Sequence, residues 1–233
     1  MKLLALDTSS EGCSAALWLD GHITGRFEVA PRGHTRLLMP MVRELLAEQG
    51  LTPSGLDALA FARGPGSFTG LRIATGVVQG LAWGLDIPVV PVSSLAAVAL
   101  QAIDKHHLPE GACVAVAFDA RMGEVYLGTF QCRDGLPVLL ADERVCPPSA
   151  VSLPDVSADR WIGVGSGWAF AGDMPADVAE TVAVVDDTLV PRAGEVVRLA
   201  EQGYRQGEAV PAEQAQPVYI RDEVAWKKLP GRD

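Results

Sequence analysis

The chain has 233 residues, of which 48% are hydrophobic and 21% charged, and its 29 acidic and 19 basic residues give a formal net charge of −10. These proportions are typical of a folded globular protein with one large domain or two small lobes, and they exclude an intrinsically disordered chain. Residues 1–105 hold 8 basic and 9 acidic residues, whereas residues 106–233 hold 11 and 20. Neither part offers a broad basic surface, so any role with RNA requires a partner.

Cysteine spacing and hydropathy indicate the cellular compartment. Four cysteines lie far apart without a C-x-x-C pair: Cys13, Cys113, Cys132 and Cys146. Such spacing favours reduced thiols over a disulfide or zinc framework. The first apolar run stops at Asp7, and no run approaches the roughly 20 residues of a membrane span. We therefore expect a cytoplasmic protein without a membrane contact.

The first half of the chain predicts three antiparallel strands followed by alternating helices and strands. Residues 2–6, 13–19 and 22–29 are the strands, and Asp20-Gly21 suits a tight hairpin turn. The later elements are a helix at 34–49, a strand at 57–62, a helix at 67–85, a strand at 88–92 and a helix at 93–103. The order predicts an α/β fold, with a mixed sheet covered by helices on both faces.

The second half partly repeats this pattern. Strands are expected at 112–119, 124–131, 138–145, 161–164 and 181–185, and a helix at 193–206. The expected lobes are residues 1–105 and 106–233, with the terminal segment from Pro217 free to pack back on the first. Each lobe begins with a strand that ends in aspartate, Asp7 or Asp119, which is a weak signal of internal duplication.

A glycine-rich segment between a strand and a helix is the most distinctive motif. Gly64, Gly66 and the possible helix caps Ser67 and Thr69 could place backbone N–H groups around an anion. The segment is not a Walker A loop, because no Gly-Lys-Ser/Thr follows. A tight, capped strand-to-helix turn explains the same residues and is favoured by spacing alone.

The polar residues that follow the first strand have two readings as well. Asp7 could hold a metal-bound water and Thr8 could meet a phosphate, or both could satisfy their own turn. The four histidines form no H-x-x-x-H or H-E-x-x-H pair, so no metal site is expected. No nucleophile and base constellation for a peptidase is found either.

Two helices carry signs of association. Gly76, Gly80 and Gly84 recur every four residues, and each costs about 1 kcal/mol of helix stability relative to alanine. Such a row implies close approach of another backbone, which belongs either to the same chain or to a second subunit. The helix at 34–49 carries a full apolar stripe, with Met39 and Pro40 lying off it.

Six collinear segments resemble the bacterial TsaB (YeaZ) family. They are LALDTSS at 4–10, VAPRGHTRLLMPMV at 29–42, RGPGSFTGLR at 63–72, PVSSL at 91–95, DARMGEVY at 119–126 and PVYIRDEVAWKK at 217–228. The resemblance implies a two-lobed actin-like, Hsp70-like ATPase (ribonuclease H-like) fold. It also implies a non-catalytic partner of a TsaD-type transferase that places threonylcarbamoyl on adenosine 37 of tRNAs reading ANN codons.

The resemblance further implies partners and site residues. A TsaE-type P-loop ATPase joins the assembly, and the isolated chain forms a homodimer. The chain contacts tRNA only as part of the complex. The contact with the TsaD-type subunit falls on the helices at 34–49 and 67–85. The expected partner-binding residues are His34, Leu37, Leu38, Met41, Val42, Leu45, Arg72, Thr75, Gly76, Gln79, Gly80 and Trp83.

The same resemblance implies loss of catalysis. The TsaD type carries a metal-binding H-x-x-x-H where this chain has Ser94 and Val98, neither of which ligates iron or zinc. No cofactor and no activity are therefore expected, and residues Asp7, Thr8, Gly64, Gly66, Ser67 and Thr69 form at most a vestigial nucleotide or anion loop. The alternative is a small phosphotransferase or ATPase that uses Asp7 and the Gly64–Gly70 loop. Lys227, Lys228 and Arg232 form a solvated basic tail or touch tRNA in the assembly.

Overall fold

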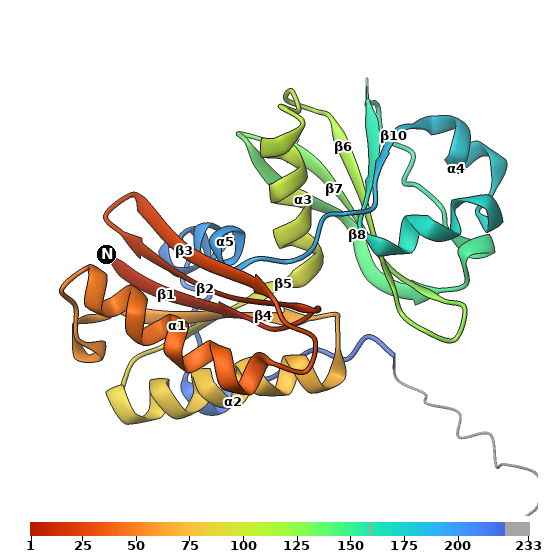
Figure 1. Cartoon of the computed structure of the whole chain (residues 1–233). Coiled ribbons are helices and arrows are strands. Elements are labelled where there is room, and N and C mark those ends of the chain that lie inside the picture. The colour runs from red at the N-terminus through yellow and green to blue at the C-terminus, as the bar shows by residue number, and fades with distance from the viewer. Residues whose placement is uncertain (159, 222–233) are drawn as a thin grey trace, which may run out of the picture.

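The computed structural model describes residues 1–158 and 160–221 and contains two lobes, each built on a five-stranded sheet (Figure 1). The first sheet has the strand order β3-β2-β1-β4-β5. Its strands are β1 (Lys2–Asp7), β2 (Gly12–Leu19), β3 (His22–Val29), β4 (Ala58–Gly64) and β5 (Val89–Ser93). The β1, β2 and β3 strands are antiparallel, whereas β4 and β5 run parallel to β1. Asp20 and Gly21 both have positive φ, which confirms the predicted hairpin turn.

The second sheet repeats the topology of the first. Its order β10-β9-β6-β7-β8 has the same two antiparallel and two parallel pairings. The strands are β6 (Cys113–Asp119), β7 (Val125–Arg133), β8 (Leu136–Cys146), β9 (Trp161–Val164) and β10 (Val182–Asp186). The shared order confirms the weak duplication signal of the sequence, and this duplicated mixed sheet is the actin-like, ribonuclease H-like fold.

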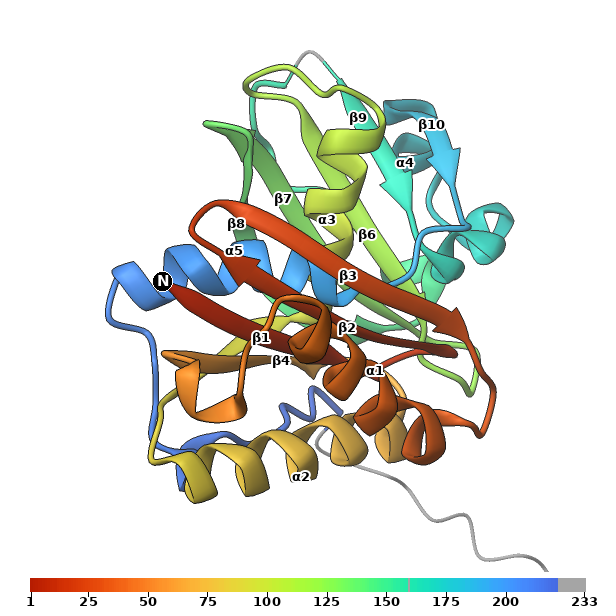
Figure 2. The same ribbon diagram turned by 60° about the vertical axis from the view of Figure 1, so that its left-hand side comes forward.

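Helices cover both faces of the first sheet. On one face, α1 (His34–Glu48) and α2 (Phe68–Leu85) pack against alternate strand residues such as Leu4, Leu6 and Phe61 (Figure 2). On the other face, α5 (Ala193–Arg205) packs against the intervening residues, including Leu3 and Ala5. Because successive side chains of each strand point to opposite faces of the sheet, they pack into two separate cores.

The second sheet is covered in the same manner. The helix α3 (Ser94–Lys105) packs on one face, and α4 (Ala176–Thr181) with the 3₁₀ segment Ser166–Asp173 packs on the other. Thus α3 precedes residue 106 but packs on the second sheet, and α5 lies near the C-terminus but packs on the first. A division of the chain near residue 105 follows the sheets but not the helices that cover them.

The predicted elements are present, with boundaries that shift by up to two residues. Ser93 caps α3, since its hydroxyl accepts hydrogen bonds from the amides of Leu95 and Ala96, each at 3.1 Å. The short helix α4 was not predicted, because six residues that follow Pro175 hold too few apolar positions to show a helical period. Lys227, Lys228 and Arg232 lie outside the described residues. Within the described part, no helix has the length and apolar character of a membrane span.

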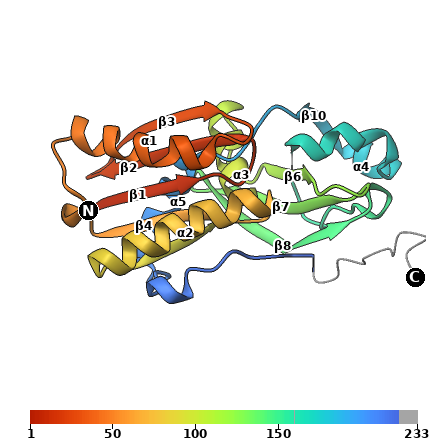
Figure 3. The same ribbon diagram turned by 60° about the horizontal axis from the view of Figure 1, so that its bottom comes forward.

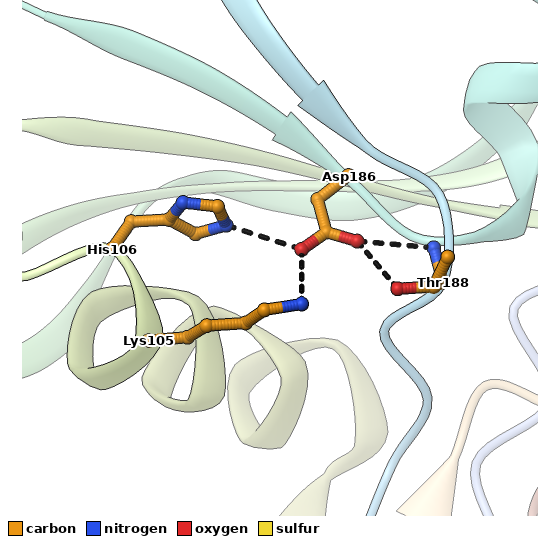
Figure 4. A network of polar contacts seen from close by, with 4 residues as sticks. All are labelled: Lys105, His106, Asp186 and Thr188. Carbon is orange, nitrogen blue, oxygen red and sulfur yellow. Dashed lines mark hydrogen bonds and ion pairs between the residues drawn. The ribbon is translucent and has the colours of Figure 1, made fainter.

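An ion-pair network ties the end of α3 to the end of β10 (Figure 4). Asp186 Oδ2 accepts from Lys105 Nζ at 2.7 Å and lies 3.2 Å from His106 Nε2, and Oδ1 accepts from the Thr188 hydroxyl at 2.6 Å. Burial acts to raise the pKa of Asp186, but the hydrogen bonds from Lys105 and Thr188 outweigh it and hold this pKa well below its ordinary value.

Replacing this carboxylate should lower stability at neutral pH. Because the folded pKa is depressed, the stabilisation is complete above the ordinary aspartate value of 3.8 and is lost as the pH falls through the lower folded value. We expect Asp186→Asn to lower the free energy of unfolding by about 1 to 2 kcal/mol at pH 7. Urea denaturation of both proteins from pH 7 to pH 3 measures this difference, and a difference that does not narrow below pH 4 would contradict the assignment.

Candidate functional site

The glycine-rich loop packs against the turn that follows β1. A Cβ on Gly70 would lie 1.9 Å from the carbonyl oxygen of Thr8, and one on Gly66 would lie 2.4 Å from that of Ser9. The Ser67 amide donates to the Ser9 carbonyl at 2.7 Å, and the Thr8 hydroxyl donates to the Gly70 carbonyl at 2.6 Å. These glycines are therefore required by close approach of two backbone segments of the same chain.

Two amides of the loop are bonded within the chain. The Ser67 amide is held by Ser9, and the Gly70 amide donates to the Ser67 hydroxyl at 3.3 Å, so Ser67 is the N-cap of α2. Thr69 is exposed at the start of the helix, and Gly64 packs against Val218, whose carbonyl oxygen would lie 2.8 Å from a Cβ. This arrangement is a capped strand-to-helix turn of the kind that spacing alone favoured.

Asp7 lies beneath this loop and is fully buried. Its Oδ1 accepts from the Ser9 amide at 3.0 Å, whereas Oδ2 has no hydrogen-bond partner among the described residues. Burial raises the pKa of Asp7 above its ordinary value, against the opposing effects of Ser9 and His34. A buried, partly unpaired carboxyl group covered by its own chain is poorly placed to coordinate a hydrated metal.

Removing the charge of Asp7 should therefore cost little. The raised folded pKa means that ionised Asp7 opposes folding more as the pH rises. We expect the free energy of unfolding of Asp7→Asn at pH 7 to be at most about 1 kcal/mol below that of the wild type, or to exceed it. The stability of the variant relative to the wild type should increase from pH 4 to pH 8. Denaturation curves across this range, together with calorimetric titration of MgATP, check the prediction. Tight MgATP binding by the wild type that is lost in Asp7→Asn would instead support the ATPase alternative.

The apolar stripe of α1 is covered by the lobe's own core. Leu38 is only 1% exposed and belongs to one cluster with Phe61 of β4. His34, Met41, Val42 and Leu45 are buried as well, and Leu37 is partly buried. The prediction that this stripe faces a partner is therefore corrected, because the apolar face of α1 packs against the first sheet. The outer face of α1 carries instead Arg36, Pro40 and Arg43.

The glycine row of α2 faces outward. A Cβ on Gly76, Gly80 or Gly84 would meet no atom within 4 Å, so no described segment of the chain packs there. Beside the row, Trp83 is 73% exposed. The sequence leaves open whether the same chain or a second subunit approaches the row, and within residues 1–158 and 160–221 no segment of the same chain does so. We refer to this exposed face of α2, with Phe68, Arg72, Gly76, Gly80 and Trp83, as the glycine face.

A C-terminal segment borders the glycine face and forms a pocket with it. Residues 216–221 run along α2 toward β8 (Figure 3), and the Val218 amide donates to the Arg63 carbonyl at 2.7 Å. Arg72 Nε donates to the Tyr219 hydroxyl at 3.1 Å, and the Arg72 guanidinium lies 3.7 Å from the centre of the Phe68 ring. The predicted residues Thr75 and Gln79 also line this pocket.

Two residues of this surface were not predicted. Phe68 stands within the glycine-rich motif and is 55% exposed, and Tyr219 lies in the terminal motif with its ring 5.4 Å from that of Phe68. The available signal for Phe68 was an aromatic residue one position after a predicted helix N-cap. Nothing in the sequence pairs Arg72 with Tyr219, because 147 positions separate them.

The positions that the metal-binding histidines would occupy are core positions here. Ser94 and Val98 are both fully buried in α3, and the Ser94 hydroxyl has no hydrogen-bond partner among the described residues. Within residues 1–158 and 160–221, no group of three His, Cys, Asp or Glu side chains could hold a metal ion. The four cysteines are buried free thiols.

Comparison with known proteins places the whole chain among tRNA-modification proteins. The family described as TsaD, tRNA N6-adenosine threonylcarbamoyltransferase, matches residues 28–229. The tRNA threonylcarbamoyladenosine biosynthesis protein TsaB of Escherichia coli is 40% identical over 100% of both chains, and that of Haemophilus influenzae is 40% identical over 100% of this chain and 99% of its own.

Solved structures that resemble this chain point to the same family. The structure of YeaZ from Pseudomonas aeruginosa is 46% identical, covers 94% of this chain and 99% of its own, and superimposes with a TM-score of 0.88. The chain belongs to the TsaB (YeaZ) family and is a protein of tRNA threonylcarbamoyladenosine biosynthesis.

Proposed function

We propose that this chain is a non-catalytic subunit that docks a TsaD-type catalytic subunit through α1 and α2. The observation that carries the proposal is the exposed glycine row of α2, which no described part of the chain covers. Glycines on a helix surface let a second helix approach closely, and three of them would otherwise only weaken α2.

The nature of the partner follows from the domain match. Because a TsaD family model matches residues 28–229, a TsaD-type protein carries a related lobe with helices equivalent to α1 and α2. Two related lobes can join through the same pair of helices about a pseudo-twofold axis, as self-complementary interfaces do. The outer residues of α1, including Arg36 and Arg43, would then lie at the edge of a four-helix contact.

Absence of catalysis is part of the proposal. Asp7 is buried, the loop amides of Ser67 and Gly70 are bonded within the chain, and Ser94 and Val98 are core residues. The chain would contribute by holding the catalytic subunit rather than by reacting. No nucleotide and no metal is assigned to it, and its net charge of −10 supports tRNA contact only through the complex.

Two further associations rest on the family resemblance. The isolated chain is proposed to form a homodimer through the glycine face, so that a second copy competes with the catalytic subunit. A TsaE-type P-loop ATPase is proposed to join the assembled pair. The assembly would work in the cytoplasm.

Size-exclusion chromatography with multi-angle light scattering tests the docking. The purified chain is mixed with the TsaD-type subunit of the same organism, and a stoichiometric complex is expected. The tRNA modification should require both proteins, and the chain alone should modify no tRNA. Separate peaks at micromolar concentration, or tRNA modification by the isolated chain, would overturn the proposal.

A further inference from the structure

The pocket between α2 and residues 216–219 is a second feature of the glycine face. Its volume is about 300 Å³, and its walls include Arg72, Thr75, Gly76, Gln79 and Tyr219. Gly76 leaves part of the α2 side of the pocket without a side chain. The pocket lies directly beside the exposed row where the proposed partner helix would cross.

The walls are held in place before any partner arrives. Gln79 Nε2 donates to the Ala215 carbonyl at 2.8 Å, which ties α2 to the start of the C-terminal segment. The Val218 amide then bonds the Arg63 carbonyl of β4 at 2.7 Å. A site whose walls are fixed in this way loses little conformational entropy on binding.

Arg72 supplies the pocket's positive charge. Its guanidinium is oriented by the Phe68 ring and by the Tyr219 hydroxyl, and neither group carries a negative charge. Among the described residues, no carboxylate forms an ion pair with Arg72, and no other charged residue lines the pocket. An oriented guanidinium with free N–H donors is suited to a planar carboxylate.

Thr75 supplies an independent observation. It is 4% exposed, and its hydroxyl oxygen is buried without a hydrogen-bond partner among the described residues. A buried, unpaired hydroxyl destabilises the fold. Because Thr75 also lines the pocket, a change to another staggered χ1 rotamer would give its hydroxyl a new direction, in which it can reach a ligand bound there.

We propose that this pocket receives a carboxylate side chain from the docked protein partner, paired with Arg72 and hydrogen-bonded by Thr75. The inference rests on the proposed docking function and names the chemistry of its anchor. One guanidinium balances one carboxylate, whereas an RNA backbone needs several cations, which the pocket of a chain with a net charge of −10 does not provide.

Two variants and one control test the anchor by isothermal titration calorimetry with the TsaD-type subunit. Arg72→Met keeps the packing stem over Phe68 but removes the charge, and we expect affinity to fall at least about tenfold, with a weaker dependence on salt. Arg72→Lys should recover part of the loss. Arg205→Met removes an exposed arginine of α5 and should bind as the wild type does.

Thr75→Val separates binding from stability. The substitution removes the unpaired hydroxyl with little change in shape, so the free chain should melt at the same temperature or higher, while affinity should fall by about threefold to tenfold. A purely structural threonine would not change stability and affinity in opposite directions.

The outcomes distinguish the anchor from the docking itself. If the wild type does not bind the TsaD-type subunit, the proposed function fails. If it binds and both Arg72→Met and Thr75→Val bind equally well, docking stands and the carboxylate anchor is wrong. If Arg72→Met loses binding to tRNA instead of binding to protein, the pocket holds a phosphate and the inference is likewise overturned.

Discussion

Replacing Gly70 by alanine should destabilise the protein more than any other glycine-to-alanine change on α2. The new Cβ would lie 1.9 Å from the Thr8 carbonyl oxygen, a backbone atom that the first strand holds in place. Relief requires moving the β1–β2 turn away from α2 and losing the Thr8 to Gly70 hydrogen bond. We expect a loss of more than about 3 kcal/mol in the free energy of unfolding, measured by urea denaturation.

Gly80→Ala is the matched control on the same helix. Its Cβ meets no atom within 4 Å, so helix propensity alone should act and raise stability by up to about 1 kcal/mol. Opposite signs at these two positions would show that α2 carries one glycine for packing inside the chain and one for its exterior. Equal effects at both positions would contradict the assignment of Gly70 to close backbone approach.

The second large effect concerns docking. Gly80→Leu should fold normally, since its Cβ would meet no described atom within 4 Å, but it should block close approach of a partner helix. We expect affinity for the TsaD-type subunit to fall at least about a hundredfold, roughly 2.7 kcal/mol, and tRNA modification by the reconstituted pair to fall with it. Calorimetry and a modification assay measure the two effects.

The control for Gly80→Leu is Gly194→Leu on α5, where an added Cβ also meets no atom within 4 Å. This variant lies on the opposite face of the first sheet and should bind as the wild type does. Normal binding by Gly80→Leu would relocate the docking surface. Leu38→Glu is not a suitable probe of docking, because it would place a charge in the core of the lobe and unfold it.

The sequence predicted the strands and long helices well because period-two and helical patterns are local. It did not predict which face of α1 is covered. A stripe from Leu38 to Leu45 shows that one side of the helix is apolar, but the pattern is the same for a stripe buried in the lobe and for one that meets a subunit. Only the packing of α1 on Phe61 decides between them.

The sequence likewise does not show what surrounds each glycine. Gly66 and Gly70 fit an anion loop and a close backbone contact equally well in the sequence, since the atoms that decide, in Thr8 and Ser9, lie about 60 positions away in the chain. Gly80 looks identical in the sequence and has the opposite surroundings. Duplication was visible only as two strands ending in aspartate, whereas strand order made it plain.

The position of α5 has a consequence for synthesis of the protein. Because this helix covers one face of the first sheet, Leu3 and Ala5 lack their cover until residues 193–205 leave the ribosome. The nascent chain would therefore carry an uncovered apolar sheet surface throughout translation of the second lobe, and its early part would be a natural substrate for chaperones.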